Sequence, residues 1–207
     1  EIGSSIADLQ ITNIGDIDYA KYDGEIELNN FDLGYFFNDP LFGTVSLKGD
    51  VNGSGFKLDN IITSFIGKVS DFQFKNYSYK NIAVNGQYQN NKFDGDLIIN
   101  DDNFIMTFNG LADLSSTIHK FDFMSDIAYL NLKETNLFVR DSIAELKGKI
   151  ELDIEGNTFD NIVGNAVFKD VFYTNQKKEF SFKEFKVSSS LKDSIKRIDV
   201  DSKDITN

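Results

Sequence analysis

Apolar and polar residues alternate along much of this chain, and this period of two restricts the fold more than any other feature of the sequence. Residues 92–100, 104–109, 120–131 and 145–155 each place apolar side chains on one side of an extended segment and polar side chains on the other. Such alternation is typical of β-strands with one buried and one solvated face. Runs such as Asn-Asn-Lys and Asn-Asp-Asp-Asn separate the segments and are typical of turns. The sequence therefore predicts an all-β meander of antiparallel strands.

The apolar positions of these strands are rich in aromatic residues. The chain contains 20 Phe and 8 Tyr but no Trp. We expect the apolar side chains to share one face of the sheet, where they would line a groove. The predicted groove-lining residues are Phe72, Phe74, Val84, Tyr88, Phe93, Leu97, Ile99, Phe104, Met106, Phe108, Phe121, Phe123, Ile127, Tyr129, Leu146, Ile150, Leu152, Ile154, Phe168, Phe180 and Phe182.

A sheet with an apolar face must hide that face from water. It can pack on a second sheet, close into a barrel, or curl around a ligand. A sandwich core and an open groove require the same alternation, so the pattern does not separate these two. An acyl chain is a ligand that would supply the missing apolar surface.

Short sequence matches recur at a spacing of about 100 residues. Leu47-Lys48-Gly49 returns 99 residues later as Leu146-Lys147-Gly148, and Asp59-Asn60-Ile61 returns 101 residues later as Asp160-Asn161-Ile162. We interpret residues 1–207 as one continuous segment that contains two tandem units, 18–118 and 119–207, the second without its last strand. Tandem units favour continuation of the sheet along one axis over closure.

One segment in each unit departs from the period of two. Residues 33, 36 and 37 are apolar at helical spacing, and Asp32 stands where an N-cap residue would. The counterpart in the second unit is Leu132–Arg140. We expect either one short helix per unit or an irregular loop in its place.

Composition argues against several classes of function. The chain has no Cys, one His and a formal net charge of −12, so we expect no catalytic residues, no cofactor, no metal site and no nucleic-acid partner. The longest apolar run is four residues, so the sequence predicts no transmembrane segment. Because the chain starts at Glu1, without an initiator Met or a signal peptide, we expect that an upstream part has been removed.

Several strand patterns resemble a known family. These are Ile82–Tyr88, Phe93–Asp101, Phe104–Gly110, Phe31–Pro40 and Asp160–Gly164. Across nearly the whole chain they are similar to the TamB-like proteins (translocation and assembly module) of the AsmA-like family, in the form found in Bacteroidetes. The matching elements are strand patterns and include no catalytic signature.

The resemblance implies a fold, a location and a function. The fold would be a long antiparallel sheet curled lengthwise into a half-pipe, or β-taco, with an apolar concave groove. The whole protein would be anchored in the inner membrane of a Gram-negative bacterium and would bridge the periplasm. It would shield phospholipid acyl chains during transport to the outer membrane. It would also be associated with outer-membrane protein assembly through a TamA-like barrel partner, bound by regions outside this chain.

Two other functions remain open from the sequence. One is a periplasmic chaperone or scaffold that offers its sheet edge to outer-membrane proteins by β-augmentation. The other is a β-sandwich binding module. We also expect self-association of the chain through its sheet edges, because exposed edge strands are templates for pairing.

Overall fold

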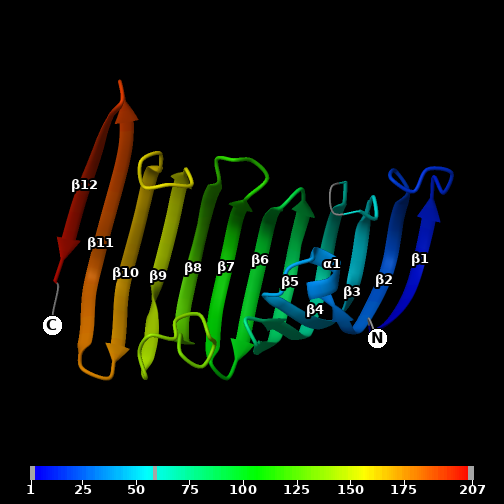
Figure 1. Ribbon diagram of the computed structural model, residues 1–207, viewed down its shortest axis with the longest axis horizontal. Coiled ribbons are helices and arrows are strands. Elements are labelled where there is room, and N and C mark those ends of the chain that lie inside the picture. The colour runs from blue at the N-terminus through cyan, green and yellow to red at the C-terminus, as the bar shows by residue number, and fades with distance from the viewer. Residues whose placement is uncertain (1–2, 58–59, 205–207) are drawn as a thin grey trace.

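The computed structural model describes residues 3–57 and 60–204, which form one antiparallel sheet of 12 strands (Figure 1). Each strand pairs with the next strand in sequence, so the predicted all-β meander is confirmed. The elements are β1 (Ser4–Thr12), β2 (Lys21–Asp32), α1 (Leu33–Phe37), β3 (Phe42–Ser54), β4 (Ile62–Phe74), β5 (Tyr77–Gln89), β6 (Lys92–Asp101), β7 (Phe104–Asp113), β8 (Lys120–Asn131), β9 (Ala144–Glu155), β10 (Val163–Asn175), β11 (Glu179–Lys192) and β12 (Ile195–Lys203).

Tight turns set the register of several hairpins. The β5–β6 connection consists of Asn90 and Asn91, and both have positive φ, at 49° and 60°. Lys75 and Asn76 join β4 to β5 in the same way, with φ of 51° and 61°. Two-residue turns with positive φ match the right-handed twist of the flanking strands, and asparagine tolerates this conformation better than most residues. The local sequence thus specifies antiparallel neighbours.

The sheet is open and forms a single layer of strands. β1 and β12 lie at its opposite ends (Figure 1), so it does not close into a barrel. The chain exposes 13054 Å², whereas a compact monomer of 23.4 kDa would expose about 9,700 Å². A second sheet packed on the first would lower the exposed area, and the described residues contain no such sheet. The sandwich alternative therefore does not describe this fold.

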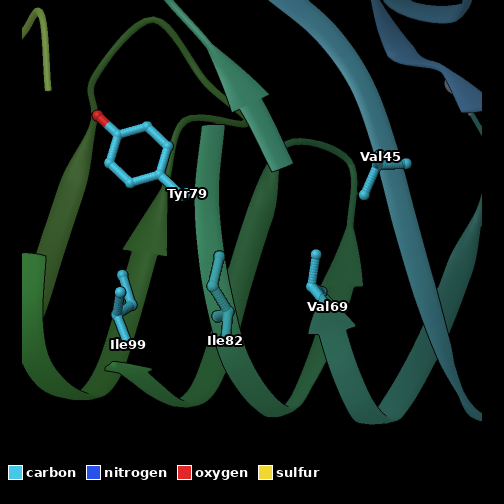
Figure 2. Packing of buried hydrophobic residues seen from close by; sticks show 5 residues of the cluster. All are labelled: Val45, Val69, Tyr79, Ile82 and Ile99. Carbon is cyan, nitrogen blue, oxygen red and sulfur yellow. The ribbon is translucent and has the colours of Figure 1, made fainter. Parts of the chain in front are cut away.

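The buried core lies on one face of the sheet. Val69, Ile82 and Ile99 are direct neighbours across β4, β5 and β6, and each is at most 9% exposed. Figure 2 shows them side by side within the curve of the strands, with Val45 and Tyr79 nearby. Since a flat single layer would leave such side chains open to water on one side, their burial reflects the curling of the sheet around this face.

Of the two alternatives for the segment after Asp32, the short helix is present. The Asp32 carboxylate accepts a hydrogen bond from the Tyr35 backbone N–H at 2.8 Å, which caps α1, and Asn38 ends the helix in the left-handed conformation. In the second unit, residues 132–143 form an irregular loop of turns instead. The Thr135 hydroxyl donates to the Asn131 carbonyl, and Asn136 has a φ of 58°, so the chain turns away after a single turn.

The two halves of the chain share local features at the spacing of the sequence matches. The register of the sheet shifts between Leu28 and Phe31 in β2 and again between Ile127 and Leu130 in β8. The turns after β3 and β9 each depend on an asparagine side chain, Asn60 or Asn161, which accepts hydrogen bonds from backbone N–H groups. Asp59 of the repeated triplet lies outside the described residues.

Candidate functional site: the apolar face of the sheet

One face of the sheet, here called the apolar face, carries apolar side chains in rows that run across the strands. Directly paired residues share a face, so the register traces each row. Three rows carry most of the face: Leu28, Leu47, Val69, Ile82, Ile99, Met106 and Ile127; Val84, Leu97, Phe108, Ser125, Ile150, Phe168 and Phe185; and Tyr88, Phe93, Ala112, Phe121 and Ile154. The sheet curls toward this face around the residues shown in Figure 2, and the space on this side of the sheet is called the trough below.

One end of the trough is closed by aromatic rings. Successive ring pairs, 4.8–6.4 Å apart between centroids, connect α1 to strands β3, β4, β5 and β7. Such distances are those of tilted and edge-to-face aromatic packing. The connected rings are Phe31, Phe36, Phe37, Phe42, Phe72, Phe74, Tyr77, Tyr79 and Phe104.

The irregular loop 132–143 completes this closed end. The Tyr79 hydroxyl donates to the Thr135 carbonyl at 3.2 Å, and the Asn136 side-chain amide donates to the Lys75 carbonyl at 3.0 Å. Both bonds join residues at least 56 positions apart in sequence. Thr135 is fully buried as a result. The loop of the second unit thus ties down the β4–β5 hairpin of the first.

A hydrogen-bonded cluster at the same end orders the hairpins. The Asp101 carboxylate accepts bonds from the Tyr77 hydroxyl, from the Lys80 backbone N–H at 3.0 Å and from the Asn103 backbone N–H at 2.9 Å. Asp101 is only 4% exposed. Burial and the bond to Asp101 together raise the pKa of Tyr77 to about 12. The partners lie in strands β5 and β6 and in the turn after β6, so the cluster joins these elements.

Away from the closed end, the apolar face is only half-buried. Phe93, Phe108, Phe123, Leu152 and Phe168 are intermediate in exposure, and Phe180 is 38% exposed. No strand or helix of the described residues packs over these side chains. This part of the face therefore retains apolar surface in contact with water.

Strands β3 to β7 each have a glycine on the apolar face. Gly86, Gly95 and Gly110 stand directly opposite one another on three neighbouring strands. The Phe93 ring lies against Gly86, where an added Cβ would be 2.7 Å from the ring. Phe65 covers Gly49 and Gly67 in the same way. Aromatic rings that lie over glycines protect the backbone and leave a smooth apolar surface.

The structure places all of the predicted groove-lining residues except Tyr129 on the apolar face, as the rows and the ring contacts locate them. Tyr129 was predicted wrongly. It pairs with Ile105 on the opposite face, and its hydroxyl contacts the Glu145 carboxylate. The register shift between Ile127 and Leu130 inverts the alternation there, so Leu130, 5% exposed, takes the inward position.

Within the predicted set, the structure separates two environments. Phe72, Phe74, Phe104 and the buried Ile99 are packed into the closed end. Apart from Tyr129, the other members line the remainder of the apolar face. Sequence reasoning also missed Val69 and Phe185, which lie in two of these rows, and Phe65, which pairs with Gly86 on the same face. An interval of three between apolar residues, as from Val69 to Phe72, was the available signal, because it marks a register shift.

The opposite face, here called the polar face, is acidic. Asp94, Asp122, Glu151 and Asp153 surround an open depression of about 580 Å³ that also includes Met124. Exposed ion pairs such as Lys149–Asp126 (3.1 Å) and Lys169–Glu151 (2.6 Å) join neighbouring strands there. Exposed pairs of this kind contribute little stability. The depression is lined mainly by side chains of the polar face.

The chemistry of the described residues is limited. Within them, no three His, Cys, Asp or Glu side chains gather as metal ligands. No helix in the described part of the chain has the length and apolar character needed to cross a bilayer. The half-buried apolar face is the most extensive candidate binding surface of the described residues.

The fold and the site define an open, single-layer antiparallel sheet that has one apolar face. No protein-family model, curated protein or solved structure gives a significant match to this chain.

Proposed function

We propose that this chain is a segment of a bridge protein that shields phospholipid acyl chains on its apolar face during transport between membranes. The observation that carries the proposal is the half-buried part of the apolar face. It continues from strand to strand through rows such as Val84, Leu97 and Phe108, and the described part of the chain forms no second layer over it. Contiguous apolar surface of this kind is typical of binding sites for apolar ligands.

The energetics favour movement over tight capture. Burying one methylene yields about 0.8 kcal/mol, so a 16-carbon chain gains on the order of 12 kcal/mol on leaving water. A bilayer provides the same gain, so transfer from the bilayer into the trough would be nearly neutral. Neighbouring rows offer similar Phe, Leu and Ile side chains, which keeps the barriers between successive positions low.

The charge distribution suits this role. The acidic residues lie on the polar face, and the apolar face between β5 and β9 carries no carboxylate outside the closed end. A net charge of −12 would repel phosphate head groups at short range. The chain would therefore hold lipids by their acyl chains and leave the head groups in water at the open side of the trough.

The location and the partners of the whole protein are part of the same proposal. Its resemblance to TamB-like proteins favours a periplasmic position in a Gram-negative bacterium and anchoring in the inner membrane. A TamA-like barrel in the outer membrane would be reached through regions outside this chain. Fractionation of cells that express the whole protein, followed by detection of this segment, tests the location.

A charge placed on the apolar face tests the function. Phe108→Asp introduces a carboxylate at a half-buried position outside the closed end, whereas Ile105→Asp introduces one on the polar face, where Ile105 is 40% exposed. We expect the chain purified from a Gram-negative host to carry phospholipid detectable by mass spectrometry. Phe108→Asp should lower the amount per chain about tenfold or more, because an unpaired carboxylate against apolar groups costs more than 1.4 kcal/mol.

Ile105→Asp should leave the amount of lipid unchanged. Unaltered lipid content in folded Phe108→Asp, with circular dichroism matching that of the parent chain, would contradict the proposal.

A chaperone that receives client strands at a sheet edge is the second candidate. It is favoured by one specific observation, which is that β12 has a partner, β11, on one side only. Disulfide crosslinking of a cysteine placed in β12 to an unfolded outer-membrane barrel protein tests this candidate. A crosslink that forms equally well from the outward-facing positions of β7 would contradict it.

A further inference from the structure

Both edge strands are unpaired on their outer side among the described residues, and both expose some apolar side chains. In β1, Ile6 is 65% and Ile11 is 44% exposed, and in β12, Ile198 is 40% and Val200 is 58% exposed. The two strands lie at opposite ends of the molecule (Figure 1). Neither edge contains proline or a register shift, two of the devices that prevent edge strands from pairing, although β12 carries the charged residues Lys196, Arg197 and Lys203.

The two edges are related by the repeat. β1 pairs with β2 through Leu9↔Gly24, and β7 pairs with β8 through Gly110↔Phe123. Phe123 follows Gly24 by 99 residues, and the same spacing relates the register shifts of β2 and β8. The position of β1 beside β2 therefore corresponds to the position of β7 beside β8.

The other edge has the matching relation. β12 follows β11 after the two-residue turn Asp193-Ser194, and β6 follows β5 after Asn90-Asn91. All four turn residues have positive φ. In the first unit β6 then pairs with β7, whereas β12 in the second unit has no further neighbour among the described residues. The position beside β12 thus corresponds to the position of β7 beside β6.

We propose that, in the 207-residue chain, β1 of a second copy pairs antiparallel with β12 and takes the position that β7 holds beside β6. The rows of the sheet specify the register. Ile198 and Ile11 belong to one row, and Val200 and Leu9 belong to the next. Pairing within rows places Ile198 opposite Ile11 and Val200 opposite Leu9 of the second copy. The apolar face is then continuous across the junction.

The two surfaces differ, so the contact is heterologous. A heterologous contact leaves one free β1 and one free β12 after each addition, and it produces open chains of copies rather than closed dimers. In the proposed register, Asp8 lies opposite Asp201 on the polar face. Like charges directly opposite each other weaken strand pairing, so association should strengthen with salt and in the variant Asp8→Lys.

Sedimentation velocity of the 207-residue chain, up to about 1 mM, covers the range in which weak complexes form. We expect concentration-dependent growth beyond the dimer. Val200→Glu and Leu9→Lys should each weaken association about tenfold or more, because a charge then faces an apolar side chain. The double variant Val200→Glu/Leu9→Lys should recover most of the loss, since the new charges are opposite in sign and face each other.

Several results would overturn the proposal. One is a parent chain that stays monomeric at every concentration. Another is weakened association in only one of the two single variants, which would indicate an isologous contact. The third is a double variant that associates no more strongly than the single variants. Asp8→Lys, at an exposed position, provides a gain of association that misfolding would not produce. Circular dichroism of each variant verifies the fold. The proposal does not depend on lipid binding, so each can fail without the other.

Discussion

Ser125 illustrates how single residues of the apolar face differ from their neighbours. It lies between Phe108 and Ile150 in one row, is 6% exposed, and its hydroxyl has no hydrogen-bond partner among the described residues. A buried hydroxyl without a partner is unfavourable. Apart from this position, the row from Val84 to Phe185 consists of apolar side chains.

Ser125→Ala should raise the free energy of unfolding by about 1 kcal/mol, because the variant removes an unsatisfied polar group at little loss of volume. Urea denaturation monitored by circular dichroism measures the change. Ser190→Ala, at an exposed position of β11, should remain within about 0.5 kcal/mol of the parent chain. Destabilisation by Ser125→Ala would show that the hydroxyl has a partner.

Ionisation of Tyr77 lowers the stability of the folded chain at alkaline pH. Its pKa is raised from 10.0 to about 12, so the folded chain holds the phenol proton more tightly than the unfolded chain. The resulting stabilisation is complete below pH 10 and is lost as the pH rises toward 12. Tyr77→Phe should therefore lose less stability than the parent chain over this interval. Identical pH profiles in urea titrations would contradict this.

At the scale of elements, alternation predicted strands well and failed where the register shifts. The segments 92–100, 104–109 and 145–155 all lie within strands, with the expected residues on one face. Tyr129 was misplaced because a bulge adds a residue, and one added residue moves the following side chain to the other face. Pairing partners decide where a bulge falls, and a single segment does not contain that information.

The irregular segments show a similar limit. Asp32 was identified as a cap from its position before Leu33, and the cap is present. The apolar spacing after Asn131 allowed a helix as well as a loop. The loop is stabilised by contacts with residues more than 50 positions away, such as Tyr79, which no local pattern indicates.

Asp32→Ala should destabilise the closed end of the trough. The substitution removes the bond to the Tyr35 N–H, and loss of an N-cap costs about 1 kcal/mol. Asp32→Asn should retain most of the stability, because its side-chain oxygen can still accept the bond. Equal stability of Asp32→Ala and the parent chain in urea denaturation would show that packing of Phe36 and Phe37 alone holds α1.

At the scale of the whole molecule, the exposed area decides between architectures that share one sequence pattern. Alternation is equally compatible with a sandwich, a barrel and an open sheet. The 13054 Å² of accessible surface and the 12-strand order without closure belong to an open sheet. The sequence did not determine this, because the choice depends on whether any segment returns to cover the apolar face. Within residues 3–57 and 60–204, only α1 and residues 132–143 do so, at one end of the trough.

Photo-crosslinking from two adjacent residues of β7 tests lipid binding on the apolar face most directly. Phe108 faces the trough and Asn109 faces the polar side, where its amide donates to Asp96 at 2.7 Å. The benzophenone analogue of phenylalanine would be placed at either position, and the chain irradiated with vesicles of phosphatidylethanolamine and phosphatidylglycerol. We expect phospholipid adducts, identified by mass spectrometry, from position 108 and few or none from position 109. Equal labelling from both positions, or no labelling from position 108 in a folded chain, would contradict an acyl-chain site on the apolar face.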